Sequence, residues 1–316
     1  MKILANDGIS QSGIDDLTAA GFEVLTTTVA QEQLGNFINT ENIVALLVRS
    51  ATTVRQDLID ACPGLKIIGR GGVGMDNIDV SYAREKGLSV INTPAASSES
   101  VAELVFAHLF SGVRFLYDSN RNMPLDGEKK FKNLKKAYAK GTELRGKTLG
   151  VIGFGRIGQA TAKMALGLGM KVIAFDPFME KTTISLAFFD GQTIDFEIKT
   201  VSKETVLKES DFITLHVPAQ KDFVIGEAEL NMMKEGAALI NAARGGVVNE
   251  VALVAALDSN KLSFAGLDTF ENEPTPAVQI LMNSKISLTP HIGAATNQAQ
   301  DRIGSELASQ IISILK

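Results

Sequence analysis

The segment from Lys147 to Asp176 constrains the fold more than any other part of this sequence. It begins with an apolar run, continues with the glycine pattern Gly153-Phe154-Gly155-Arg156-Ile157-Gly158, and then has a helical pattern through Leu168. A second apolar run, Lys171–Phe175, ends at Asp176. A lone GxGxxG is a weak signal, but here strand, glycines, helix, strand and acid follow in the order of a βαβ unit. The segment therefore predicts an α/β fold with a parallel sheet.

The glycine turn has the chemistry that a dinucleotide requires. Gly153 permits the tight turn, Gly155 lets the backbone approach a pyrophosphate, and Gly158 allows close packing of helix and strand. The N–H groups at the start of the helix, near Arg156 and Ile157, would hold the diphosphate.

Asp176 follows Gly158 by 18 positions, close to the usual spacing of the ribose-binding acid. Its carboxylate can accept hydrogen bonds from both ribose hydroxyls and would repel a 2′-phosphate. This favours NAD over NADP as the cofactor. The alternative is an aspartate that only caps the next turn.

The length of 316 residues predicts two domains, because a single hydrophobic core is then near its upper size limit. Short β-rich runs alternate with helical stretches in the first ninety-odd residues, which implies a parallel sheet covered on both faces. The runs read as strands are Lys2–Asn6, Phe22–Thr26, Ile43–Arg49, Leu65–Gly69 and Leu88–Asn92, and the helix candidates are Ile14–Ala20 with Ser10 or Ser12 as cap, Val54–Ala61 and Asp79–Lys86.

The middle and end of the chain hold further elements. Ser98–Tyr117 has helical spacing of apolar residues and predicts one long, mostly buried helix, and Asn120–Lys140 predicts a surface helix or connector. Two β-rich runs around Asp190-Gly191 predict a hairpin over Ile184–Val201. The tail Gln298–Leu315 predicts a terminal helix.

Composition excludes several classes of protein. No apolar run approaches the roughly 20 residues that span a bilayer, and Asp7 comes too early for a secretory signal. The single cysteine, Cys62, cannot form an internal disulfide, which fits a reducing cytoplasm. The net charge of −5 argues weakly against nucleic acid. We expect a small-molecule substrate, no membrane or nucleic-acid partner, and no metal.

Three later segments combine the groups that hydride transfer needs. Asn241–Gly246, Asp268–Pro274 and Thr289–Gly293 each follow a short apolar run, so all three should lie at strand ends, where open α/β sheets bind ligands. Arg244 offers a planar donor for a carboxylate. His291 could take the hydroxyl proton, and Glu273 could orient it.

Other interpretations of these residues exist. An arginine at a strand end is more often a surface or interface residue. Of the three histidines, His108 lies on the apolar face of the long helix and is expected to be structural. His216, in His216-Val217-Pro218, follows a strand and could line the cofactor groove, but His291 is preferred as the base.

Together these motifs resemble the D-isomer-specific 2-hydroxyacid dehydrogenase family over nearly the whole chain. The resemblance implies catalytic roles for Arg244, Glu273 and His291. It implies two similar Rossmann-like or flavodoxin-like domains: a substrate-binding domain of residues 1–97 and 290–316, and an inserted NAD-binding domain of residues 98–289, with the active site in the cleft between them. It also implies a homodimer formed through the nucleotide domain. The further cofactor-binding positions that it implies are His216, Val217, Pro218, Ala242, Ala243, Arg244, Asp268, His291, Gly293 and Ala294.

Within that family, Val48–Thr52, Gly69–Asn77 and Asn92-Thr93-Pro94 resemble the branch that oxidises 3-phosphoglycerate at the opening of serine biosynthesis. Arg49 would bind the phosphate, and backbone N–H groups of Val73 and Gly74 could form an anion nest for the carboxylate. A surface salt bridge is the alternative role for Arg49. The substrate contacts expected in all are Arg49, Ser50, Val73, Gly74, Asn92, Arg244 and His291.

The sequence also departs from the family. It has no tryptophan, although the family often has one before the position of Gly141, and Lys136 is a candidate for a basic contact there. The chain ends at Lys316, so a C-terminal regulatory domain is not expected. Two other functions stay open: a glyoxylate or hydroxypyruvate reductase, and an NAD-sensing corepressor of the C-terminal-binding-protein type.

Overall fold

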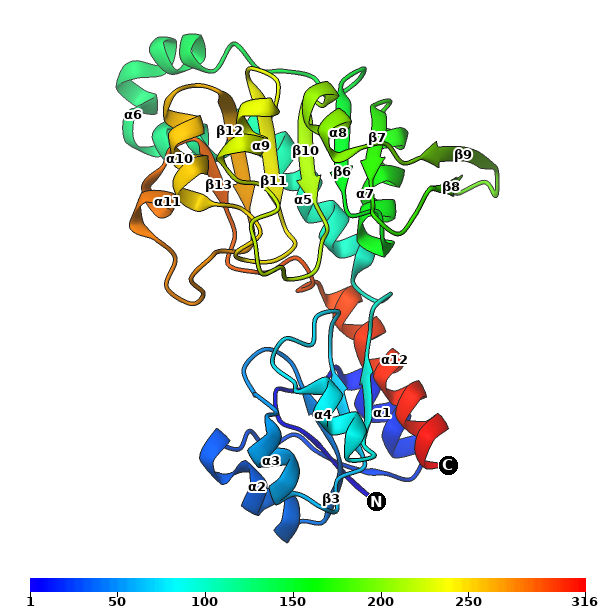
Figure 1. The fold of residues 1–316 in the computed structure, drawn as a ribbon. Helices are drawn as coiled ribbons and strands as arrows, with labels where there is room; N and C mark the ends of the chain where they lie inside the picture. Colours follow the sequence, from blue (N-terminus) through cyan, green and yellow to red (C-terminus); the bar gives the residue numbers. More distant parts are fainter. The chain divides into compact units, whose positions relative to one another are not determined.

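The computed structural model describes all residues from 1 to 316 and divides into two compact units. Unit 1 comprises Met1–Ser100 and Ala294–Lys316, and unit 2 comprises Val101–Gly293 (Figure 1). The expected boundaries, after residue 97 and after residue 289, lie a few residues from these. One unit is thus inserted in the sequence of the other.

Unit 1 is a five-stranded parallel sheet with helices on both faces. The strand order is β2-β1-β3-β4-β5, the flavodoxin-like order. Its strands are β1 (Lys2–Ala5), β2 (Glu23–Leu25), β3 (Ile43–Val48), β4 (Ile67–Arg70) and β5 (Ser89–Asn92), and its helices are α1 (Gln11–Ala19), α2 (Gln31–Thr40), α3 (Gln56–Ala61), α4 (Val80–Glu85) and α12 (Asn297–Leu315).

The two faces of this sheet have separate cores. Helices α2, α3 and α4 cover one face, with Leu34 and Leu58 in its core, and α1 and α12 cover the other, with Leu17 and Ile311. Helix α12 lies directly against α1: a Cβ added at Gly13 would be 2.8 Å from the Gly304 Cα atom. The terminal helix therefore belongs to the fold of unit 1.

Most sequence predictions for unit 1 are confirmed within a few residues, and one element was missed. Ser10 caps α1, because its Oγ accepts the Gly13 N–H (3.4 Å). Helix α2 was not predicted. It starts at Gln31, its N-cap residue Ala30 has no side chain that could cap it, and only Leu34 and Ile38 of its ten residues are buried. The usual signals of a helix start and of an apolar face are therefore weak there.

Unit 2 is a six-stranded parallel sheet with the order β13-β12-β11-β10-β6-β7. The chain runs from β6 to β7 in one direction and then from β10 in the other, so the switch point lies between β6 and β10. The strands are β6 (Thr148–Ile152), β7 (Lys171–Phe175), β10 (Phe212–Leu215), β11 (Ala237–Asn241), β12 (Leu262–Leu267) and β13 (Ile286–Leu288).

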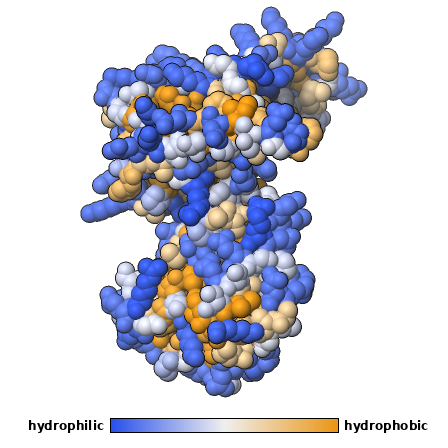
Figure 2. Space-filling model, turned by 90° about the vertical axis from the view of Figure 1, so that its right-hand side faces the viewer, coloured by the Kyte–Doolittle hydropathy of each residue, from blue (hydrophilic) through white to orange (hydrophobic).

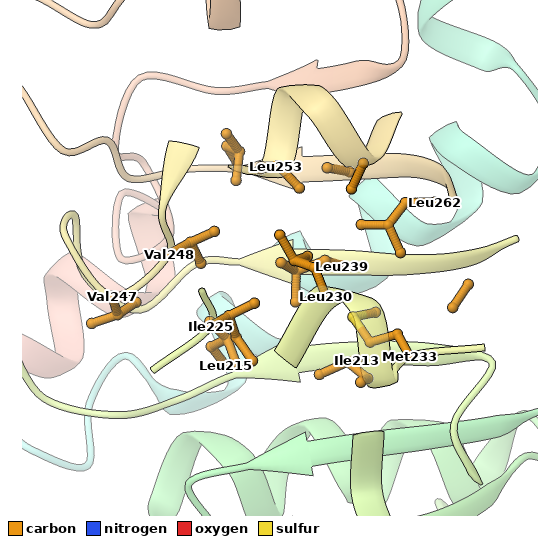
Figure 3. Close-up of a cluster of buried hydrophobic side chains, with 14 of the residues drawn as sticks. Ile213, Leu215, Ile225, Leu230, Met233, Leu239, Val247, Val248, Leu253 and Leu262 are labelled. Atoms are coloured by element: carbon orange, nitrogen blue, oxygen red, sulfur yellow. The ribbon is translucent and has the colours of Figure 1, made fainter. Parts of the chain in front are cut away.

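Helices cover both faces of this second sheet. The helices of this unit are α5 (Ser98–Val113), α6 (Leu116–Ala137), α7 (Arg156–Gly167), α8 (Lys203–Glu209), α9 (Glu227–Met232), α10 (Glu250–Asp258) and α11 (Val278–Met282), of which α6 does not pack on the sheet. Figure 3 shows one of the two cores, in which Leu215 and Leu239 of the sheet meet Leu230 and Leu253 of the helices. The other core lies under α5 and α7.

The long helix predicted over Ser98–Tyr117 is shorter than expected. It ends at Val113, because Phe115 has a φ of 55° and interrupts the helical backbone before α6 begins. Helix α6 has no buried residue, in agreement with the predicted surface helix.

The predicted hairpin is confirmed as strands β8 (Lys181–Ala187) and β9 (Thr193–Lys199), with Gly191 at a φ of 85° in the turn. The ribbon extends from the side of unit 2 next to β7 (Figure 1). Its face with Ile184 packs into the core beside α7, whereas Phe189 at the tip is fully exposed.

The face shown in Figure 2 is largely hydrophilic and also has hydrophobic areas on both units. None of the helices combines the length and the apolar character that crossing a membrane requires.

Helix α5 packs on β12 so closely that Gly112 has no room for a side chain. A Cβ at this position would be 2.1 Å from the buried Phe264 ring. We expect Gly112→Ala to lower the free energy of unfolding by about 1–3 kcal/mol, because the overpacking outweighs the better helix propensity of alanine.

The matched control is Gly167→Ala in α7, where an added Cβ meets nothing within 4 Å. This change should raise the free energy of unfolding by about 0.5–1 kcal/mol. Urea unfolding followed by circular dichroism compares the two variants. Equal stability of both would contradict the close packing of α5.

Candidate active site

The candidate residues of unit 2 gather at one edge of its sheet. All six strands are parallel, so their carboxyl ends lie at the same edge. Each strand is followed there by a polar or glycine-rich loop: Gly153 after β6, Asp176 after β7, His216 after β10, Ala242 after β11, Asp268 after β12 and Thr289 after β13.

The glycine turn after β6 has the backbone that its sequence predicted. Gly153 has a φ of 91°, and a Cβ there would be 2.5 Å from the His216 carbonyl oxygen. A Cβ at Gly158 would be 2.2 Å from the Gly153 carbonyl oxygen, so helix α7 meets the turn directly. Gly155 faces open space, and α7 begins after it without a side-chain cap. The turn therefore leaves room for a pyrophosphate at the helix N-terminus.

Asp176 ties the glycine turn to the loop after β7. Its Oδ2 atom accepts the Phe154 N–H (2.7 Å), and its Oδ1 atom accepts the Phe178 N–H (2.9 Å). The carboxylate is half-buried next to the open side of the turn. These features fit the pyrophosphate and the adenosine ribose of NAD.

The loop after β11 holds Arg244 through a buried asparagine. The side chain of Asn241 donates to the Arg244 carbonyl oxygen (2.9 Å) and accepts the Ala243 N–H (3.1 Å). A Cβ at Gly245 would be 1.8 Å from the Phe270 carbonyl oxygen, so the loops after β11 and β12 are in backbone contact. Asn241 was not singled out by sequence, although a polar residue at the end of an apolar strand is a signal for such a role.

Glu273 and His291 form the pair that the sequence analysis expected. The distance between Glu273 Oε2 and His291 Nδ1 is 2.8 Å, and both side chains are partly exposed. Glu273 Oε1 accepts the Phe270 N–H (3.0 Å), which fixes the carboxylate. Because a carboxylate can only accept, His291 Nδ1 donates to it, and Nε2 is left as the proton acceptor.

His291 itself has an unusual backbone, with a φ of 54°. Such a conformation is disfavoured for a residue with a side chain and persists where the surroundings fix it. Asp268 supplies part of this support, since its carboxylate accepts the N–H groups of Ile292 and Gly293, both at 2.8 Å.

His216 is unsuited to act as the base. Its Nε2 atom is 3.1 Å from Thr214 Oγ1, and its Nδ1 atom is buried without a hydrogen-bond partner. Burial lowers the pKa of His216 to about 3, so the ring is neutral at physiological pH. Its backbone carbonyl lies beside Gly153, and its contact with the cofactor stays a prediction.

The candidate residues of unit 1 lie at the carboxyl ends of β3, β4 and β5. Arg49 is half-buried, its N–H donates to Asp7 Oδ2 (2.6 Å), and its carbonyl accepts from Asn77 Nδ2 (2.8 Å). Asn92 Nδ2 donates to the Val73 carbonyl oxygen (2.7 Å) and so supports the Val73-Gly74 turn. Ser50 is exposed beside Arg49.

Lys136 does not join the carboxyl edge of the sheet in unit 2. It is exposed in the last turn of α6, which leads into a groove lined by Tyr138, Lys147 and Lys285 near the amino ends of the strands. The basic contact expected of Lys136 stays a prediction.

A parallel sheet with a glycine turn at its switch point, an acid at the end of the second strand and an imidazole–carboxylate pair is typical of an NAD-binding oxidoreductase. The family model described as "D-isomer specific 2-hydroxyacid dehydrogenase, NAD binding domain" matches residues 106–293. The chain therefore belongs to the D-isomer-specific 2-hydroxyacid dehydrogenases, which are NAD-dependent enzymes.

Individual relatives agree with this assignment. The chain is 43% identical over 298 residues to a hydroxypyruvate reductase of Thermotoga maritima, covering 93% of this chain and 91% of that protein. It is 38% identical over 320 residues to a D-3-phosphoglycerate dehydrogenase of Archaeoglobus fulgidus, covering 100% of this chain but 58% of that protein. A glyoxylate reductase structure from Paecilomyes thermophila superimposes with a TM-score of 0.82 at 27% identity, covering 100% and 95% of the two chains.

Two glutamates join the loops that carry the catalytic candidates. The Glu250 N–H donates to Glu271 Oε1 (2.7 Å), and the Glu271 N–H donates to Glu250 Oε1 (2.8 Å). Burial raises the pKa of Glu250, and the charge of Glu271 acts in the same direction. The charged form of Glu250 is therefore disfavoured in the folded state, and it lowers stability at pH values above its pKa.

We expect Glu250→Gln to stabilise the protein at pH 7, because glutamine keeps the accepting oxygen and removes the buried charge. The gain should vanish below about pH 4, where the glutamate is protonated in both folded and unfolded states. Urea midpoints at the two pH values measure this difference. The exposed Glu128→Gln change on α6 is the control and should have no effect at either pH. A loss of stability in Glu250→Gln at pH 7 would contradict this account.

Proposed function

We propose that this enzyme oxidises 3-phospho-D-glycerate to 3-phosphohydroxypyruvate with NAD, the reaction that opens L-serine biosynthesis, in the cytoplasm. The observation that supports this substrate is that two arginines, Arg49 and Arg70, lie at the carboxyl ends of the neighbouring strands β3 and β4. A Cβ at Gly71 would be 3.6 Å from Arg49 Cγ, and Arg70 Nη1 donates to the Gly71 carbonyl oxygen (3.2 Å), so both flank one turn. Two cations at adjacent strand ends suit a doubly charged phosphate.

The chemistry follows from the groups at the carboxyl edge of unit 2. When bound, NAD supplies the nicotinamide ring that accepts the hydride from C2 of the substrate. His291 Nε2 takes the proton of the C2 hydroxyl, and the Glu273 carboxylate stabilises the imidazolium that results. Arg244 holds the substrate carboxylate and polarises the reacting oxygen. One hydride and one proton leave the alcohol, and a ketone remains.

A reductase acting on hydroxypyruvate or glyoxylate is the second candidate. It is favoured by the 43% identity to the Thermotoga maritima hydroxypyruvate reductase. Those substrates carry no phosphate, so the proposed phosphate contact of Arg49 would have no role in their binding.

A panel of D-2-hydroxy acids and their keto forms, followed by NADH absorbance, separates the two candidates. We expect the highest kcat/KM for 3-phosphoglycerate and 3-phosphohydroxypyruvate. Arg49→Ala should lower kcat/KM for the phosphorylated substrates by roughly 10- to 100-fold, the scale of a lost hydrogen bond between charged groups, and should change D-glycerate turnover little.

Arg55→Ala is the matched control, because Arg55 lies in the same unit in an exposed ion pair with Asp79. It should leave both activities unchanged. A wild-type preference for unphosphorylated hydroxypyruvate or glyoxylate would assign the chain to the reductases instead.

The role of His291 has its own test. We expect His291→Ala to lower turnover about 100-fold or more, the usual scale of general acid–base catalysis. NADH binding, measured by fluorescence, should persist, because the glycine turn and Asp176 remain. Near-normal turnover in this variant would remove His291 from the role of base.

We also propose that the enzyme is a homodimer. Helix α6 supports this, because it exposes the apolar side chains of Leu116, Met123, Leu125 and Phe131 on a surface helix. Clustered exposed apolar residues typically mark an interface. Light scattering tests the proposal, and a monomer mass at micromolar concentration would contradict it.

A further inference from the structure

His108 lies at the centre of a buried chain of side chains that the proposed mechanism leaves unused. It is on α5, is 2% exposed, and reaches two residues near the end of β13. Its Nδ1 atom is 2.9 Å from Ser287 Oγ, and its Nε2 atom is 3.0 Å from Thr289 Oγ1. Thr289 Oγ1 in turn donates to Asp268 Oδ1 (2.6 Å). The chain therefore runs from Ser287 through His108 and Thr289 to a carboxylate.

The direction of every hydrogen bond in this chain follows from its last member. The Asp268 carboxylate can only accept hydrogen bonds, so the Thr289 hydroxyl, which has a single hydrogen, donates it to Asp268. The Thr289 oxygen must then accept from His108, which places a proton on His108 Nε2. Burial lowers the pKa of His108, so the ring is neutral, and Nδ1 accepts from the Ser287 hydroxyl.

The same carboxylate holds the loop that carries His291. Asp268 accepts from the Thr289 side chain before His291 and from the Ile292 and Gly293 N–H groups after it. His291 lies between these attachment points with its φ of 54°. The orientation of Asp268 therefore influences where the imidazole of His291 is held.

Close packing fixes His108 against this loop. A Cβ at Gly266 in β12 would be 2.7 Å from the His108 Cβ atom, and one at Gly293 would be 3.3 Å from a methyl group of Val101 on the same helix. Glycines at these two points let α5 approach the strand and the loop. A side chain at 108 with another shape cannot be accommodated by a simple shift of the helix.

We propose that His108 is a positioning residue for His291: through Thr289 and Asp268 it orients the 289–293 loop, without touching substrate or cofactor. The proposal rests on the proposed role of His291 as the base. It differs from a general packing role because the donor at Nε2, and not only the volume of the ring, is required.

Four variants test this requirement. His108→Leu removes the donor, Thr289→Val removes the next hydroxyl with little change of shape, and His108→Gln can place an amide N–H near the position of Nε2. Val105→Ala is the packing control, because Val105 is buried on the same helix outside the chain of hydrogen bonds.

We expect His108→Leu and Thr289→Val each to lower kcat roughly tenfold, since small displacements of a catalytic group cost one to two orders of magnitude. The KM of the hydroxy acid should change by less than about twofold. The double variant should be no slower than either single one, because both break the same chain. His108→Gln should recover most of kcat, and Val105→Ala should lower the melting temperature while keeping kcat.

A kcat for His108→Leu within about twofold of that for Val105→Ala would overturn the proposal, and so would a double variant in which the two losses multiply. If His108→Leu does not fold, the comparison is made between Thr289→Val, which should lose kcat, and His108→Gln, which should keep most of it. Normal turnover in His291→Ala would defeat the proposed function instead. An inactive His291→Ala together with an unaffected Thr289→Val would defeat only the positioning role.

Nitrogen-15 NMR of the imidazole rings gives a readout that does not depend on activity. The protein has three histidines, so their signals can be assigned with single substitutions. His108 should show the neutral tautomer protonated at Nε2, with no titration near the pH where free histidine titrates. A tautomer protonated at Nδ1 would reverse the chain of donors and contradict the proposal.

Discussion

A parallel sheet delivers the carboxyl ends of all its strands to one edge, and the candidate active site of unit 2 depends on that constraint. Residues as far apart in sequence as Gly153 and His291 follow strands of the same sheet. At the switch point between β6 and β10, neighbouring loops diverge and leave space at this edge. The glycine turn after β6 places no side chain in that space. The sheet topology thus brings the candidate residues together, and the loops that follow the strands carry their side chains.

Carboxylates that accept backbone N–H groups then give these loops their shape. Asp176 joins the glycine turn to the loop after β7, Glu273 fixes His291, and Asp268 holds the backbone that follows. Each carboxylate accepts backbone N–H groups, which compensates for the loss of water around its charge. The loops are consequently anchored at defined points, although loops in general are the more mobile parts of a fold.

The sequence predicted the helices, the strands and the types of candidate residue better than it predicted the side-chain contacts between residues that are distant in the chain. The order of strand, glycines, helix and acid was sufficient for the turn at Gly153, because those residues are consecutive and local. The end of α5 was misjudged, since apolar spacing continues past Val113 while the backbone at Phe115 is left-handed. Helix α2 was missed because it has few buried apolar residues and no capping side chain. The partners of His108 were beyond prediction, since Ser287 lies 179 positions away in the chain.

Features that cost stability collect at the carboxyl edge of unit 2. His291 has a disfavoured φ, Glu250 is a buried acid facing another acid, and His216 has a buried nitrogen without a partner. The backbone of His291 and the unpaired nitrogen of His216 would each typically lower the free energy of unfolding by about 1–3 kcal/mol. The apolar cores beneath the edge, where the largest side chains are fully buried, supply the opposing stability. A strained residue that its own hydrogen bonds hold in place, as at His291, is what a pre-organised site requires, because its groups then need little rearrangement when the reaction occurs.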